Sequence, residues 1–136
     1  MAAFESHLIV VPQMRTKITI LIGGDYDDHI KAFTSKRLTK MEKTVLAEFL
    51  RDNKNKFEAV TLIPTTRPQA LFIYFHKRPD LTKPDTVDTI AHEILHCTFS
   101  ILKRLEVRFN SGSEEAFTYL HGYLMGEFWK RLKPTP

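Results

Sequence analysis

The chain has 136 residues, of which 43% are hydrophobic and 26% charged, and its formal net charge is +4. This length and composition are typical of one globular domain, and they exclude a fibrous or low-complexity protein. The single cysteine, Cys97, excludes an intrachain disulfide, and the modest positive charge permits a polyanionic partner without requiring one.

No segment of the sequence predicts a membrane protein. The N-terminal apolar run 8–11 is too short for the core of a signal peptide. No stretch approaches the roughly 20 apolar residues that a membrane helix needs. A lone cysteine is typical of a reducing compartment. We therefore expect a cytoplasmic protein with no membrane partner.

The first half of the chain predicts a small β-sheet and one helix. Short runs rich in β-branched and aromatic residues predict strands over 8–11, 17–22, 58–63 and 70–75. Thr39 and Glu42 have the spacing of a capping box, so we expect the helix to begin at Lys40. The acidic turn at Asp25 could start another helix; it lacks the ligand pattern of a calcium loop.

The second half predicts two long helices, over 86–105 and 114–132, joined by a polar loop. In the first of these, apolar residues recur at helical spacing from Val87 to Leu105. Strands followed by helices indicate an α+β fold, and no boundary divides residues 1–136, which we expect to form a single domain.

The segment that carries chemistry is His92-Glu-Ile-Leu-His96, in the middle of the first long helix. Residues four apart share a helix face, so both imidazoles can bind one zinc ion. Glu93 is rotated off that face and can take a proton from a zinc-bound water. Such pairs also arise by chance. Here, however, the pair flanks an apolar stripe containing Ile94, where unpartnered polar groups would be costly.

A catalytic zinc usually has three protein ligands, and the last helix offers Glu114 and Glu115 as the third. The loop 108–113 can span back about 20 Å, enough to return the chain to the level of His96. Acidic residues in a first turn also favour the helix dipole, so one of the two can serve that role alone. We prefer Glu115, because residues Ala116, Phe117, Leu120 and Leu124 define the predicted buried side.

This pattern resembles the gluzincin zinc metallopeptidases, and most of all the minimal gluzincins and short bacteriophage proteins with the same motif. The resemblance covers about residues 70–128. It implies a zinc site of His92, His96 and Glu115, with Glu93 as general base and a peptide or protein substrate. It further implies that strand 70–75 borders a cleft where an extended substrate adds as a strand. A viral source would place the protein in the host cytoplasm.

Tyr119 departs from the family pattern, and other polar side chains of the second half of the chain also need a role. Tyr119 stands where gluzincins carry a residue that orients a histidine. We predict Tyr119 instead as a donor to the developing oxyanion, with Tyr123, His121 and His76 as other available groups. His121 is also a conceivable ligand, but its spacing favours a surface or interface histidine. Cys97 is expected to be a buried spectator.

The sequence thus favours a zinc-dependent metallohydrolase, a peptidase in particular, and leaves two alternatives. One is a non-catalytic regulatory protein in which zinc ties the two last helices together; a structural site would usually need a fourth protein ligand. The other is a basic nucleic-acid-binding protein that uses the Lys and Arg residues of helix 40–52 and of the C-terminal helix.

Overall fold

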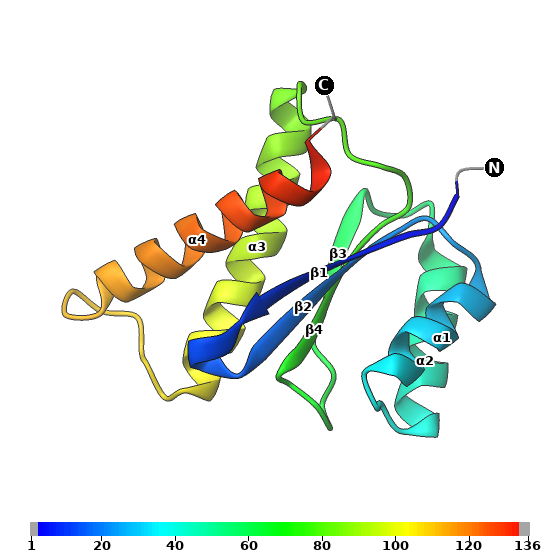
Figure 1. The fold of residues 1–136 in the computed structure, drawn as a ribbon, viewed down its shortest axis with the longest axis horizontal. Helices are drawn as coiled ribbons and strands as arrows, with labels where there is room; N and C mark the ends of the chain where they lie inside the picture. The colour runs from blue at the N-terminus through cyan, green and yellow to red at the C-terminus, as the bar shows by residue number, and fades with distance from the viewer. Residues whose placement is uncertain (1–2, 134–136) are drawn as a thin grey trace.

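The computed structural model describes residues 3–133, which form a four-stranded sheet with helices on both faces (Figure 1). In chain order the elements are β1 (Glu5–Val11), η1 (Pro12–Met14), β2 (Thr16–Ile22), α1 (Tyr26–Ser35), α2 (Lys40–Asn53), β3 (Ala59–Leu62), β4 (Ala70–Phe75), α3 (Pro84–Arg104) and α4 (Glu114–Leu132). The α+β class predicted from the sequence is confirmed. Within the described residues, no helix is both long and apolar enough to cross a bilayer.

The strands lie in the order β1-β2-β4-β3. β1 and β2 are an antiparallel pair joined by the short η1 turn, β2 and β4 are parallel, and β3 and β4 are antiparallel. β4 is therefore an interior strand, and all six of its residues are buried. The expectation that strand 70–75 borders a substrate cleft is wrong, because its backbone is already paired on both sides; the edge on that side is β3.

Two hydrophobic layers cover the sheet. α1 and α2 pack on one face, and α3 and α4 pack on the other (Figure 1). Along β4, Leu71, Ile73 and Phe75 point to the α3–α4 side, whereas Phe72 and Tyr74 point to the α1–α2 side. Burial on both faces explains why this strand is apolar at every position instead of alternating with polar residues.

The sequence predicted one helix before β3, and the structure has two. α1 is short and buries only His29 and Phe33, so its apolar spacing is a weak signal. Its beginning is nonetheless well defined. The side chain of Asp25 accepts a hydrogen bond from the backbone N–H of Asp28 at 2.9 Å, and the Asp28 carboxylate accepts one from the N–H of Asp25 at 3.0 Å. The interpretation of Asp25 as a helix cap is confirmed.

Asp25→Ala should lower the melting temperature at pH 7 by about 3–6 °C, because it removes this N-cap. The Asp28 N–H holds the pKa of the Asp25 carboxyl below its usual value. A depressed pKa in the folded state means that the stabilisation is present at neutral pH and is lost as the pH falls through that pKa. The difference in melting temperature between the wild type and Asp25→Ala should therefore narrow as the pH falls below the ordinary aspartate pKa of about 3.9, and thermal unfolding at a series of pH values measures it. Asp25→Asn, which still caps, is the control.

Candidate metal centre

Helix α3 determines where the His92-to-His96 segment points. Proline at its first position starts the helix at Pro84, two residues earlier than expected. Ile90, Ile94 and Cys97 pack into the core under the sheet. Because these positions face inward, the two histidines between and beside them lie on the outer flank of the helix, and both are exposed.

The two imidazoles converge on one point. The Nε2 atoms of His92 and His96 lie 3.1 Å apart, with ring centroids at 4.7 Å and ring planes at 84° to each other. Two nitrogens that each coordinate one tetrahedral zinc at about 2.0–2.1 Å would lie about 3.3 Å apart. The pair therefore fits a shared metal ion. The same separation also suits a hydrogen bond between two neutral imidazoles of opposite tautomer.

Glu93 turns away from the histidine pair toward the edge strand β3. Glu93 is only 7% exposed, and its Oε1 accepts a hydrogen bond of 2.8 Å from the hydroxyl of Thr61. The other oxygen, Oε2, is left 4.0 Å from the Nε2 of His92. One carboxylate oxygen is thus anchored to β3 while the other stays beside the point where the imidazoles meet. Thr61 belongs to no motif, and no local pattern in the sequence indicates its role.

The third predicted ligand is not brought to this pair. Among residues 3–133, no three His, Cys, Asp or Glu side chains are grouped closely enough to hold a metal ion. Glu115 is exposed, in the first turn of α4. It shares its helix face with Gly122 and Gly126, where an added Cβ would meet nothing within 4 Å. That face of α4 therefore looks into open space.

A different face of α4 is turned to α3. The Nε2 of His121 lies 3.3 Å from the carbonyl oxygen of Ala91, so His121 sits between the two helices, as its spacing predicted. Glu114 precedes His121 by seven residues, which is two helical turns, and so lies on the same face. Of the two glutamates, Glu114 is therefore the one on the α3 side of α4, and neither is grouped with the histidine pair in the described structure.

The other side chains that the sequence analysis considered are exposed, are buried in the core or make contacts elsewhere. Tyr119 is 72% exposed, on the outward face of α4. The hydroxyl of Tyr123 donates to the carbonyl of Val10 in β1. His76, half-buried, directly follows β4. Cys97 is fully buried, as predicted, and burial together with the charge of Glu93 raises the pKa of its thiol to about 12.

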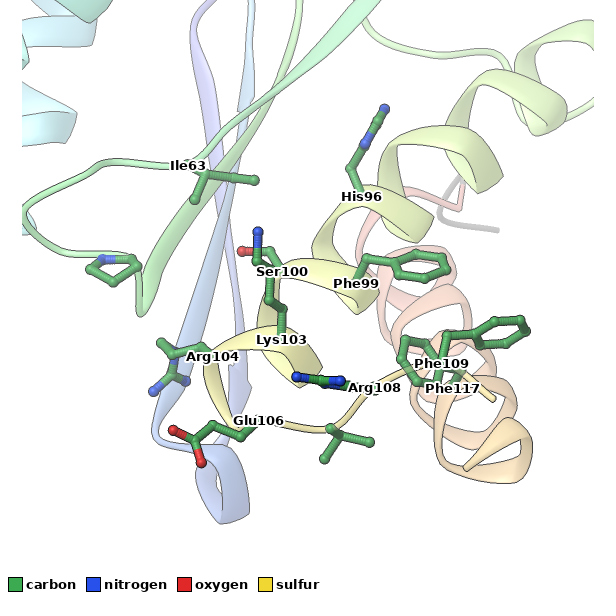
Figure 2. Close-up of a pocket in the computed structure, with 12 residues that line it drawn as sticks. Ile63, His96, Phe99, Ser100, Lys103, Arg104, Glu106, Arg108, Phe109 and Phe117 are labelled. Atoms are coloured by element: carbon green, nitrogen blue, oxygen red, sulfur yellow. The ribbon is translucent and has the colours of Figure 1, made fainter. Parts of the chain in front are cut away.

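An open groove of about 1240 Å³ runs from His96 along the C-terminal half of α3. Figure 2 shows Ile63 on one side of the groove and the rings of Phe99, Phe109 and Phe117 on the other. The three rings contact one another, with centroid distances of 4.9–5.8 Å. The groove is thus apolar at one wall and lies next to the histidine pair.

No protein-family model, no curated protein and no solved structure matches the chain.

Proposed function

We propose that the protein is a zinc-dependent hydrolase that cleaves peptide bonds, with a gluzincin-like site completed by an acidic residue of α4. The observation that carries the proposal is the 3.1 Å separation of the His92 and His96 Nε2 atoms beside a buried carboxylate. Two exposed imidazoles would supply two of the three protein ligands, the oriented carboxylate of Glu93 would supply the general base, and the acidic residue of α4 would supply the third ligand.

The roles of the residues follow from their positions. His92 and His96 would hold zinc, which when bound polarises a carbonyl group and lowers the pKa of water. Glu93 would accept the proton of the attacking water through Oε2, because Oε1 is occupied by the hydroxyl of Thr61. Holding the carboxylate in one orientation favours proton transfer, which requires a heavy-atom distance of about 2.6–3.2 Å.

The surroundings support an extended peptide as substrate. Within the described residues β3 is an edge strand, so its outer backbone groups are free to pair with an added chain. Thr61, in the middle of that strand, connects it directly to Glu93. The neighbouring groove adds the aromatic wall of Phe99 and Phe109 and the exposed cations Lys103 and Arg108. A substrate side chain that contacts the aromatic wall would be apolar, and a neighbouring acidic residue of the substrate would meet the cations.

Cleavage of a random peptide library by the zinc-loaded protein, read by mass spectrometry, tests the proposal. We expect cuts at a restricted set of sites, enriched in bulky apolar and acidic residues on one side. A zinc chelator should abolish the cuts, and His96→Ala should give none. A protein that holds zinc but cuts no peptide would instead support the non-catalytic alternative.

A further inference from the structure

A second cleft lies at the end of the sheet where β2 and β4 begin, and we call it the basic cleft. Its volume is about 550 Å³. Five cationic side chains line it: Arg15, Lys17, Lys36, Arg37 and Arg67. No carboxylate is among its lining residues in the part of the chain that the structure describes, and none of these residues belongs to the candidate metal centre.

Three segments far apart in the sequence meet here. The turn after η1 and the start of β2 contribute Arg15 and Lys17. Lys36 and Arg37 directly follow α1, and the β3–β4 loop contributes Arg67. The parallel register of β2 and β4 brings the first and last segments together, since the backbone N–H of Lys17 donates to the carbonyl of Gln69 at 2.9 Å. The cluster is therefore a product of the fold.

The cations of the basic cleft have no counter-charge in the part of the chain that the structure describes. Within residues 3–133, none of the five side chains takes part in an ion pair. The Nε of Arg67 is buried and has no hydrogen-bond partner among the described residues. Burial and the nearby charge of Lys17 lower the pKa of Lys36. Cations held close enough to disfavour one another's charge are stabilised by an anion that joins them.

A structural role accounts for only part of the cluster. Basic residues at the end of a helix interact favourably with its dipole, which explains Lys36 and Arg37 after α1. It does not explain Arg15, Lys17 or Arg67, which come from a turn, a strand and a loop. Arg15 and Arg37 also have positive φ angles, 48° and 62°, an uncommon backbone conformation for residues other than glycine.

The size and lining of the cleft indicate the class of ligand. Its volume is that of a small-molecule site, and its non-polar lining is limited to Val10, Pro12 and Ala70. Its lining, as far as the described residues go, includes no aromatic ring on which a nucleic-acid base could stack. We propose that the basic cleft binds a small anion carrying two or more phosphate groups, such as a polyphosphate or a polyphosphorylated metabolite.

Inorganic tripolyphosphate is the probe, measured by thermal unfolding and by calorimetry at constant ionic strength without divalent cations. A saturating concentration should raise the melting temperature by about 4 °C or more. The double variant Lys17→Gln/Lys36→Gln should bind at least about tenfold more weakly. The matched control Lys31→Gln/Lys54→Gln removes two exposed charges outside the cleft and should bind within about twofold of the wild type.

Three results would overturn the proposal: no stabilisation beyond that of sodium chloride, an equal loss in the control variant, or a single-stranded oligonucleotide that binds over about 100-fold more tightly than tripolyphosphate. Because tripolyphosphate also chelates zinc, the stabilisation should persist in His92→Ala. Amide chemical shifts of the wild type offer a readout that needs no cleft variant. On addition of tripolyphosphate, the amide shifts of residues 15–17, 35–37 and 67–70 should change. If only the shifts of other residues change, the proposal is contradicted.

Discussion

His92→Ala and His96→Ala should each purify with almost no zinc, whereas the wild type should carry about one zinc per chain. Each imidazole supplies one of the two nitrogens that converge at 3.1 Å, and a single remaining histidine cannot hold the ion in place. Metal analysis after dialysis against trace zinc measures the difference. His76→Ala, which removes a histidine outside the pair, is the control and should keep its zinc. Full zinc in either ligand variant would refute the site.

Glu114→Ala and Glu115→Ala form a matched pair that tests the third ligand. Both substitutions remove one exposed carboxylate from the first turn of α4, so they change the helix dipole interaction equally. We expect Glu114→Ala to weaken zinc binding at least about tenfold and Glu115→Ala to leave it within about twofold, because only Glu114 shares the face of His121. The reverse result would identify Glu115 as the third zinc ligand, as the sequence predicted. If neither variant loses zinc, the third ligand is another residue, and His121→Ala is the next test.

The sequence predicted the elements of the fold well because their local signals are strong. β4 and α4 were predicted over residues 70–75 and 114–132, the ranges that the structure shows. The position of β4 inside the sheet was missed, although its apolar residues at every position already indicated burial on both faces. α1 was missed as a full helix because only His29 and Phe33 are buried in it.

The contacts of the site depend on tertiary structure and were less predictable. The spacing of His92 and His96 was sufficient to predict that their imidazoles meet, because a helix fixes that geometry locally. The preference for Glu115 came from including Ala116 in the buried side of α4. Ala116 is exposed, and the buried side is centred on Phe117, Leu120 and Leu124. The face of α4 that is turned to α3 is shown by the contact between His121 and Ala91, a tertiary contact that no local pattern gives, and Glu114 lies on that face.

The contact between β3 and α3 could not be predicted from the sequence either, because it also depends on tertiary structure. Thr61 and Glu93 are 32 positions apart, and no local pattern links them. The basic cleft is a further case. Only Lys36 and Arg37 are adjacent in the sequence, where they look like part of a solvated surface. Their grouping with Arg67 requires the crossover that makes β2 and β4 parallel.

Glu93→Gln should reduce turnover of any peptide identified in the library assay by about 10²–10⁴-fold while leaving the zinc content unchanged. The amide has nearly the shape of the carboxylate and can still accept the hydrogen bond from Thr61, but it cannot take a proton from water. Separate measurement of zinc and of kcat distinguishes loss of the base from loss of the metal. A Glu93→Gln protein with full activity would exclude Glu93 as the general base.

Thr61 should act as a positioning residue, and the pair Thr61→Val and Thr61→Ser tests that role. Valine has nearly the shape of threonine but no hydroxyl, so the Glu93 carboxylate loses its 2.8 Å anchor. We expect kcat to fall about tenfold with KM and zinc content nearly unchanged, because substrate contacts remain while the proton acceptor moves more freely. Serine keeps the hydroxyl and should recover most of kcat. A merely structural contribution would lower the melting temperature of Thr61→Val without changing kcat at temperatures where the protein is folded, and that outcome would remove Thr61 from the reaction.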